Sequence, residues 1–361
     1  MKVVYFTMIL LLFSCSKSVD DRCFVDKINS EDIVIHDDIS QTYTPEQILK
    51  EKPSYLEIIS LAKYRSFKED STSAHSYGKG FKEKMMLKEV GFKEFNNKFD
   101  MQFDYISQQK VGNIQYALGV NNLGYWLLKI ENGKPSAYFL GLSFSHYYLN
   151  KIQEQPIIEG EYLQVGGSFV KIIQVGGLPG YDDYSAMEDG KLFKIKLKDL
   201  MQDTDRDGFN DIFEKSFGLN EHNKDTDGDG INDFEDMNPM FKSEKNKFTQ
   251  LYELLLSNNI YGDGDWKKIN YTFSVFQTDC DYFHQVSPEF RILFIPEDKN
   301  KQPYYTRVTD ITEETISPIQ KNKMNPNSFY IYKSGNSYKN DYSADFEDGK
   351  WVLKVVGGYV I

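Results

Sequence analysis

Apolar and polar residues alternate along much of the chain, and this pattern predicts strands more often than helices. The clearest case is a pair of aromatic and β-branched runs, Gly124–Glu131 and Lys134–Phe144, separated by the dipeptide Asn132-Gly133. Asn-Gly is typical of the tight turns that join antiparallel strands, so we expect a β-hairpin here. Similar runs predict further strands at 161–174, 191–197, 269–277, 289–295, 304–309, 328–333 and 351–361.

Helices are predicted where a capping residue precedes an apolar stripe. Thr44–Gln47 (TPEQ) and Ser54–Glu57 (SYLE) both have the spacing of a capping box, and the first adds proline at the first helical position. A helix that starts at Ser54 would bury its apolar face. The residues on that face are Leu56, Ile59 and Leu61. We also expect a break at 71–73 (STS) and further helices within Phe81–Phe99 and Asn246–Ser257.

Two stretches of the chain resemble each other. Asp183–Leu197 (DYSAMEDGKLFKIKL) matches Asp341–Val356 (DYSADFEDGKWVLKVV), and each follows a strand-like run that starts at Ser168 or Ser328. We interpret each stretch as the last two strands of a β-rich domain that occurs twice. The alternative is the chance recurrence of a common Asp-Gly hairpin.

The formal charge of −12 is concentrated in one segment. Residues 203–236 hold twelve acidic and three basic side chains, and twelve minus three leaves −9 of the total in 34 of the 361 residues. Such a segment repels itself unless a counter-ion is present. An acidic chain without a basic cluster is also repelled by phosphate, so we expect no nucleic acid among its partners.

This acidic segment consists of two loops of the same design. DTDRDGFNDIFE starts at Asp203, and DTDGDGINDFED starts at Asp225, 22 residues later. Each loop places side-chain oxygens at positions 1, 3, 5, 9 and 12, glycine at position 6 and a backbone carbonyl at position 7, which is the spacing by which one loop surrounds a calcium ion. The predicted ligands are Asp203, Asp205, Asp207, the carbonyl of Phe209, Asp211 and Glu214 in the first loop, and Asp225, Asp227, Asp229, the carbonyl of Ile231, Asp233 and Asp236 in the second. At position 9, Asp211 and Asp233 reach the metal either directly or through a water molecule.

The alternative interpretation of these residues is a solvated acidic linker, which is what most charge runs are. A random run, however, does not repeat its glycine and its oxygen spacing twice. Nor does it carry apolar residues between the acids, as this segment does at Phe209, Ile212, Phe213, Ile231 and Phe234. We therefore predict a module that binds two or more structural calcium ions and becomes rigid when it does so.

At these loops the chain resembles the bacterial form of the thrombospondin type 3 repeat family. The acidic positions carry the resemblance, together with Gly218–Lys224 before the second loop and Met237–Pro239 after it. The repeats of that family bind calcium in strings and act mainly as stiffened spacers between other domains, so the resemblance implies a spacer. The chain departs from the family in having only two loops and in carrying Glu214 at position 12, as an EF-hand does.

The N-terminal residues predict export and lipid anchoring. Lys2 followed by the apolar run Val3–Phe13 is typical of a signal peptide, and the run is too short to span a bilayer. Leu12–Cys15 (LFSC) resembles a bacterial lipobox, which implies lipidation of Cys15 and attachment to the outer membrane. An ordinary secretory signal with an incidental cysteine is the alternative. The polar residues that follow resemble the surface-export tag of Bacteroidetes lipoproteins, or form a plain tether.

Cys23 and Cys280 remain after removal of the signal. In an exported protein these two residues can form a disulfide, and two free thiols are the alternative.

Together these observations predict an α+β, β-rich fold with two sheet-containing domains, which a duplication would relate, joined by a calcium-binding loop module. The expected division is a signal peptide at 1–14, a tether at 15–44, an N-terminal α+β domain at 45–200, the calcium module at 201–240 and a C-terminal β-rich domain at 241–361.

No catalytic motif stands out, and we prefer a non-catalytic function. The leading hypothesis is a lipid-anchored outer-membrane protein, exposed at the cell surface, whose calcium spacer presents β-rich domains to a protein or glycan, as in adhesion. One alternative is a calcium-stabilised surface hydrolase that acts on a glycan or a peptide with paired carboxylates. Another is an envelope protein that shields its own cell from a toxin.

Overall fold

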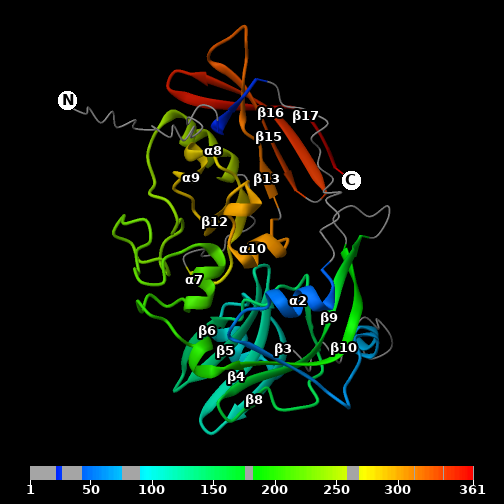
Figure 1. Cartoon of the computed structure of the whole chain (residues 1–361). Helices are drawn as coiled ribbons and strands as arrows, with labels where there is room; N and C mark the ends of the chain where they lie inside the picture. The colour runs from blue at the N-terminus through cyan, green and yellow to red at the C-terminus, as the bar shows by residue number, and fades with distance from the viewer. Residues whose placement is uncertain are drawn as a thin grey trace, which may run out of the picture.

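The computed structural model describes residues 22–26, 43–74, 90–174, 182–257, 268–312, 314–335 and 337–360. Within these ranges the fold is α+β and β-rich, with sheets of four, five, two and six strands. Figure 1 shows the four-stranded sheet at one end of the molecule and the C-terminal strands β15 to β17 at the other, with α7, α10 and β12 between them. Among the described residues, no helix has the length and apolar character needed to cross a membrane.

The four-stranded sheet is an antiparallel meander in the order β3-β4-β5-β6. Its strands are β3 (Asp104–Val111), β4 (Ile114–Asn121), β5 (Gly124–Glu131) and β6 (Lys134–Phe139). The predicted hairpin is confirmed, because β5 and β6 pair from Trp126↔Phe139 to Glu131↔Lys134. Both turn residues have positive φ, 52° at Asn132 and 75° at Gly133, as a primed turn requires.

The five-stranded sheet has the order β2-β10-β9-β7, with β8 on β9. Its strands are β2 (Leu56–Ser60), β7 (Tyr147–Leu149), β8 (Ile158–Glu159), β9 (Tyr162–Gln174) and β10 (Asp182–Lys196). The helix expected after Ser54 is therefore wrong: Leu56–Ser60 pairs antiparallel with β10, from Leu56↔Ile195 to Ser60↔Lys191. A short apolar run is compatible with either a helix or a strand, and here pairing with β10 makes it a strand.

The six-stranded sheet has the order β1-β14-β15-β16-β17, with β13 on β15. Its strands are β1 (Phe24–Val25), β13 (Glu314–Ile316), β14 (Ile319–Lys321), β15 (Ser328–Gly335), β16 (Tyr338–Glu347) and β17 (Lys350–Val360). The two similar stretches fold differently here. Asp341–Val356 forms the β16–β17 hairpin, whereas its counterpart stays within β10 as far as Lys196. The register of β10 shifts between Ala186 and Lys191.

The interpretation of both stretches as two strands is thus wrong for the first. In β16–β17 the Asp-Gly dipeptide forms the turn, with φ of 48° at Asp348 and 78° at Gly349. In β10 the same dipeptide lies in an irregularity opposite β9, and the strand continues beside β2. What the two stretches share is an antiparallel pairing of their first half with the preceding strand, β9 or β15.

The longer helices are α2 (Pro45–Glu51), α3 (Phe67–Ala74), α5 (Lys93–Lys98), α7 (Asp211–Phe217) and α8 (Lys247–Ser257). Two predictions are confirmed by their caps: Thr44 and Gln47 form the capping box of α2, and Asn246 accepts hydrogen bonds from the backbone of Phe248 and Thr249 at the start of α8. The break expected at 71–73 is wrong, since α3 includes these residues. Of the pattern at Phe81–Phe99, residues 81–89 lie outside the described residues.

Short helical turns are α6 (Leu197–Leu200), α9 (Asp281–His284), η2 (Lys299–Lys301) and α10 (Tyr304–Val308). The strand expected at 304–309 is therefore wrong. Tyr304–Val308 follows Pro303 as a single helical turn that buries Tyr305, and the Tyr305 hydroxyl donates a hydrogen bond to the Leu123 carbonyl, 2.6 Å away. A five-residue run is too short for its periodicity to separate a turn of helix from a strand.

Two apolar cores share a small parallel sheet, β11 (Ser274–Gln277) with β12 (Ile292–Ile295). Leu293 and Ile295 face the first core, which contains the side chains of the N-terminal sheets, and Ile292 and Phe294 face the second, which contains α8 and the C-terminal sheet. Successive residues of a strand point to opposite sides, so β12 separates the two cores and belongs to both. The packing consequently does not change at residue 240, because residues as late as Ile311 lie in the first core.

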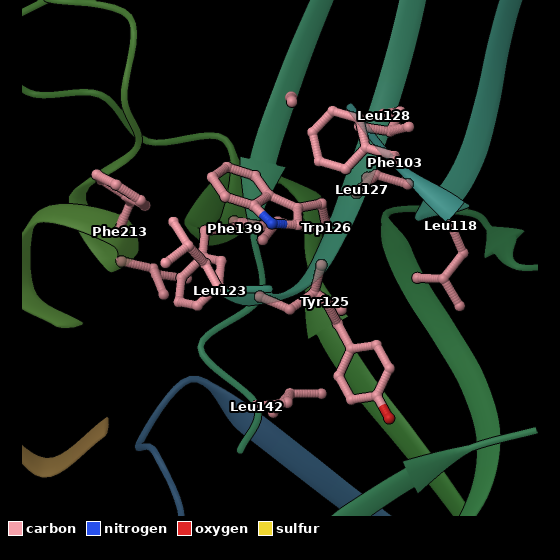
Figure 2. Close-up of a cluster of buried hydrophobic side chains, with 14 of the residues drawn as sticks. Phe103, Leu118, Leu123, Tyr125, Trp126, Leu127, Leu128, Phe139, Leu142 and Phe213 are labelled. Carbon is pink, nitrogen blue, oxygen red and sulfur yellow. The ribbon is translucent and has the colours of Figure 1, made fainter. Parts of the chain in front are cut away.

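The segment at 201–240, expected to be a spacer, also belongs to the first core. Figure 2 shows Phe213 of α7 beside Trp126 and Phe139. Its ring centroid lies 5.6 Å from that of Trp126 and 5.8 Å from that of Phe139. Phe209 and Phe217 are buried in the same core. The segment is therefore packed between the N-terminal sheets and β12 and does not hold two halves apart.

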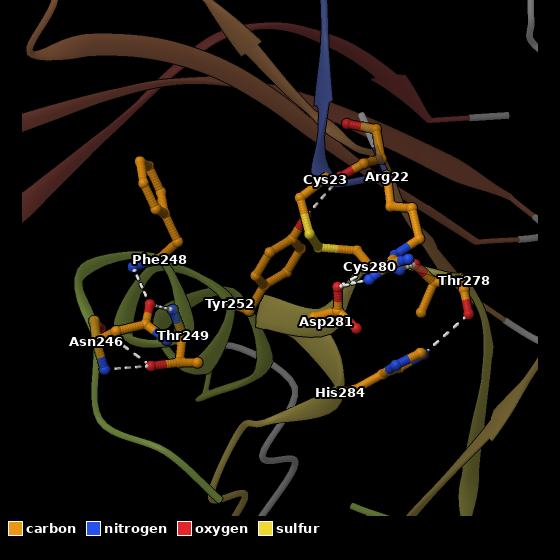
Figure 3. The surroundings of a disulfide bond; sticks show 11 residues. Arg22, Cys23, Asn246, Phe248, Thr249, Tyr252, Thr278, Cys280, Asp281 and His284 are labelled. Carbon is orange, nitrogen blue, oxygen red and sulfur yellow. Dashed lines mark hydrogen bonds and ion pairs between the residues drawn. A yellow bond between two sulfur atoms is a disulfide. The ribbon is translucent and has the colours of Figure 1, made fainter. Parts of the chain in front are cut away.

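A disulfide joins Cys23 to Cys280, which decides between the two alternatives for these cysteines. Figure 3 shows the bridge beside the ion pair of Arg22 with Asp281. Residues 22–26, part of the expected tether, thus lie against the C-terminal region, where β1 pairs with β14. The signal peptide and Cys15 lie outside the described residues.

Candidate metal centre

The two acidic loops share a set of hydrogen bonds between carboxylates and backbone amides. The carboxylate at position 1 accepts from the amides at positions 4 and 6, which are Arg206 and Gly208 for Asp203, and Gly228 and Gly230 for Asp225. The carboxylate at position 3 accepts from the amide at position 5, and the one at position 5 from the amide at position 7. At positions 3 and 5 one oxygen of each acid thus organises the backbone and the other makes no backbone hydrogen bond, whereas both oxygens of the acid at position 1 accept from backbone amides.

The glycine at position 6 is required by the backbone, since φ is 119° at Gly208 and 100° at Gly230. The two glycines differ in their surroundings. A Cβ on Gly208 would lie 3.0 Å from the ring of Phe234, a side chain of the other loop, whereas a Cβ on Gly230 has no neighbour within 4 Å. The first loop is therefore packed directly against the second at this point.

We expect both Gly208→Ala and Gly230→Ala to destabilise the protein, the first more than the second. The left-handed backbone costs an alanine about 1–2 kcal/mol at either site. The crowding of Phe234 is an additional cost at Gly208 only. Urea unfolding at saturating calcium measures the difference, and equal effects would contradict the packing of the two loops against each other.

The carboxylates gather in three groups, in each of which one oxygen per residue lies within 4.8 Å of the others. Asp203, Asp205 and Asp207 form the first group, and Asp225, Asp227 and Asp229 form the second. The third joins both loops, because it consists of Asp207, Glu214 and Asp233. The structure thus brings the predicted ligands at positions 1, 3 and 5 together in both loops.

Several of these oxygens are buried without a hydrogen-bond partner. They are Oδ2 of Asp205, Asp207 and Asp227 and both carboxylate oxygens of Glu214. Glu214 is 0% exposed and Asp207 is 7% exposed. A buried, unpartnered carboxylate is costly unless a proton or a cation compensates it. The geometry of both loops therefore fits a hard cation with oxygen ligands.

The electrostatics agree with this interpretation. Burial, reinforced by the neighbouring acids, raises the pKa of Glu214 to about 9, that of Asp207 to about 7 and that of Asp227 to about 6. The pKa of Asp205 is raised for the same reasons. Without a metal these groups hold protons at pH values where carboxyl groups are normally ionised.

We accordingly expect the stability of the calcium-free protein to fall as pH rises. The raised folded-state pKa values mean that the folded protein binds more protons than the unfolded chain between about pH 4.3 and 9, so the free energy of unfolding decreases across that window. A cation bound between these carboxylates would replace the protons, so the stabilising effect of calcium should grow with pH. Thermal unfolding at pH 5 and pH 8, with chelator or with calcium, tests this. An identical calcium effect at both pH values would contradict it.

The acids at position 9 are held by a threonine at position 2. Thr204 donates to both carboxylate oxygens of Asp211 through its amide and its hydroxyl, and Thr226 does the same for Asp233. Asp211 also accepts a hydrogen bond from the side-chain amide of Gln202, and it is absent from the three carboxylate groups. Asp236, predicted at position 12 of the second loop, is likewise outside these groups, and its carboxylate accepts from the Asn238 backbone.

The side chains of the residues at position 7 do not share one environment. Phe209 is buried in the first core, where its ring is stacked on Phe213 with centroids 4.2 Å apart. Ile231 is exposed. The role predicted for both residues belongs to their backbone carbonyls and does not depend on these side chains.

Two buried polar residues fasten the loops to the rest of the molecule. Asn210 accepts a hydrogen bond from the amide of Phe139 and donates to the carbonyls of Phe139 and Leu200, which attaches the first loop to the end of β6. On the other side, Asn238 donates to the carbonyls of His284 and Val286. The module is thus bound to both the N-terminal and the C-terminal parts.

Arg291, the residue before β12, is a buried cation beside this centre that sequence analysis did not identify. It is 3% exposed, and its guanidinium donates to the carbonyls of Asp233 (2.6 Å) and Phe234. It lies over the rings of Phe209, Phe234 and Phe273, at 4.7 Å from the centroid of Phe273. Burial lowers its pKa to about 10, so it remains charged at neutral pH.

The loop spacing identified the acids, but not the residues that hold them. Thr204 and Thr226 could have been found, because both loops begin with Asp-Thr-Asp. Arg291 could not, since it lies 55 residues beyond the second loop and no local pattern marks it. The predicted lipidation site, Cys15, lies outside the described residues.

A scan against family models, a search of curated proteins and a search of solved structures each found no match for this chain. The assignment of the centre therefore rests on its own residues.

Proposed function

We propose that this chain is a calcium-binding protein in which residues 203–236 form a module of the thrombospondin type 3 kind, and that the bound ions are structural. The observation that carries the proposal is Glu214, which is fully buried with both carboxylate oxygens unpartnered. One of these oxygens lies within 4.8 Å of a carboxylate oxygen of Asp207 and of Asp233. Three buried carboxylates at this spacing repel one another unless protons or a cation neutralise them.

The donor set favours calcium over other metals. All candidate ligands are carboxylate or carbonyl oxygens, which suit hard cations, and no cysteine or histidine takes part in the three groups. The loops also supply six candidate ligands each, which fits the high coordination number and flexible geometry of calcium better than the strict octahedron of magnesium. A structural ion fits a module that is attached to both cores, to the first through Asn210 and to the second through Asn238.

Isothermal titration of the metal-free protein with calcium tests the proposal. We expect two or more ions to bind with dissociation constants at or below about 1 mM, the range of extracellular calcium modules, and magnesium to bind more weakly. The double variant Asp205→Asn with Asp227→Asn should lose most of this binding. Glu235→Gln, which removes an exposed charge from the same segment, should keep it. An absence of saturable calcium binding in the wild-type protein would overturn the proposal.

We further propose that the protein is exported and anchored to the outer membrane through Cys15. The apolar run Val3–Phe13 and the lipobox-like Leu12–Cys15 support this, and the disulfide Cys23–Cys280 suits an oxidising compartment. In membrane fractionation of cells, we expect the wild-type protein in the membrane pellet and Cys15→Ser in the soluble or secreted fraction. Recovery of both in the soluble fraction would contradict the anchor.

Presentation of the β-rich parts to a protein or glycan stays a prediction, and so does the protective envelope role. The alternative of a surface hydrolase requires paired carboxylates in a pocket. A hollow lies between β9, β10 and the loop after β7. Glu154 is the one carboxylate among its lining residues, which also include Tyr64, Arg65 and Asn150. This hollow therefore gives no specific support to a glycosidase.

A further inference from the structure

We propose that Asp233, a residue of the second loop, completes the calcium site of the first loop, and that the two sites therefore bind calcium cooperatively. This inference rests on the calcium-binding function proposed above and adds a ligand shared between the loops. The loop spacing alone assigns Asp233 to its own loop, at position 9.

The first observation is the position of the Asp233 carboxylate. One of its oxygens lies within 4.8 Å of carboxylate oxygens of both Asp207 and Glu214, positions 5 and 12 of the first loop. All three side chains are buried, and Asp233 is 1% exposed. Oxygens that share one calcium ion lie at such separations, because each is about 2.3–2.6 Å from the metal.

The second observation is that three carboxylate oxygens of Asp207 and Glu214 have no hydrogen-bond partner among the described residues. Both oxygens of Glu214 and Oδ2 of Asp207 are buried and make no hydrogen bond. These oxygens point to a ligand that the protein itself does not supply. A cation between Asp207, Glu214 and Asp233 compensates all three charges at once.

Asp233 can serve this site while it is held by its own loop. Its two oxygens each accept one hydrogen bond from Thr226, and each carboxylate oxygen retains a further lone pair for a metal. Its backbone is also fixed, because its amide donates to the Lys224 carbonyl and its own carbonyl accepts from Arg291. The equivalent acid of the first loop, Asp211, is bound by Thr204 and Gln202 and has no such contact with the second loop's acids.

These contacts explain how one ion affects the other. Thr226 lies between Asp225 and Asp227, two predicted ligands of the second loop. An ion in the second loop fixes Asp225 and Asp227 and so fixes Thr226, which in turn holds the Asp233 carboxylate toward the first loop. The first site is then better organised before its own ion arrives, which is positive cooperativity.

The test measures the calcium affinity of the first site in a variant whose second site has lost two of its predicted ligands. In a background of Asp225→Asn with Asp227→Asn, the remaining high-affinity calcium ion should be bound by the first loop. Adding Asp233→Asn should raise the dissociation constant of that ion by about tenfold or more. This is the usual effect of losing a carboxylate that binds a metal or orients one of its ligands. Adding Glu235→Gln, which removes an exposed charge two residues after Asp233, should change that dissociation constant little.

Thr226→Val in the otherwise wild-type protein is a milder second variant. It keeps every carboxylate and removes one of the two hydrogen bonds from Thr226 to Asp233. We expect the Hill coefficient of calcium binding to fall from above 1 toward 1, with native near-ultraviolet circular dichroism at saturating calcium.

The outcomes separate this inference from the proposed function. If the wild-type protein binds no calcium, the proposed function fails and this inference fails with it. If the wild-type protein binds two ions but Asp233→Asn and Glu235→Gln have equal effects in the background of Asp225→Asn with Asp227→Asn, only the shared ligand is overturned. Independent binding with a Hill coefficient of 1 in the wild-type protein overturns the cooperativity in the same way.

Discussion

Removal of calcium is expected to lower the free energy of unfolding by about 5 kcal/mol. An ion present at a hundred times its dissociation constant stabilises the folded state by about 2.7 kcal/mol, and the structure offers two loops. Part of this stabilisation reflects the relief of repulsion between buried acids such as Asp207 and Glu214. The melting temperature should fall by about 10 °C or more when chelator replaces calcium.

Differential scanning calorimetry with calcium, with magnesium and with chelator measures this effect. The double variant Asp205→Asn with Asp227→Asn is the matched control, since it removes one ligand from each loop and should make the transition insensitive to chelator. Glu235→Gln should respond as the wild type does. Superimposable transitions with and without calcium would show that the ions have no structural role.

Replacement of Arg291 by methionine is expected to destabilise the protein by about 3 kcal/mol or more even at saturating calcium. The guanidinium is buried, donates to the carbonyls of Asp233 and Phe234, and lies over three phenylalanine rings. Loss of one partner from a buried charged network typically costs about 3–5 kcal/mol. The loss also leaves two carbonyls and nearby acids without their cation.

Urea unfolding of Arg291→Met, Arg291→Lys and Arg307→Met measures this contribution. Lysine keeps the charge but cannot reproduce the planar contacts, so its effect should be intermediate. Arg307 is exposed, and its replacement should change the free energy of unfolding by about 0.5 kcal/mol or less. If Arg291→Met and Arg307→Met have equal effects, Arg291 does not link the module to β12.

Local sequence patterns predicted the elements that depend on local geometry. The β5–β6 hairpin follows from Asn132-Gly133, whose φ angles form the turn, and α2 follows from its capping box at Thr44. The same is true of the loops, in which each carboxylate bonds to backbone amides two to five residues ahead. In all these cases the interacting groups are close in sequence.

The secondary-structure predictions were wrong where pairing with a strand distant in sequence determines the conformation. Leu56–Ser60 has a cap signal but pairs with β10, more than 130 residues later. The Asp-Gly dipeptide forms a turn in β16–β17 and an irregularity in β10, because β10 continues beside β2 and β9. Neither outcome can be derived from the residues of the stretch itself.

The candidate site shows the same division. The acids at positions 1, 3 and 5 follow from spacing, whereas the approach of Asp233 to Glu214 depends on how one loop packs on the other. The resemblance implied a spacer, but Phe209, Phe213 and Phe217 pack into the first core. A pattern of apolar residues indicates that they are buried without indicating which partner buries them.

Hydrogen–deuterium exchange of the protein with and without calcium tests most directly whether bound ions join the two cores. The account predicts slower exchange with calcium in residues 203–236 and also at their anchoring points, the end of β6 at Phe139 and the start of β12 at Ile292. Slower exchange confined to the loops, or no change anywhere, would contradict it.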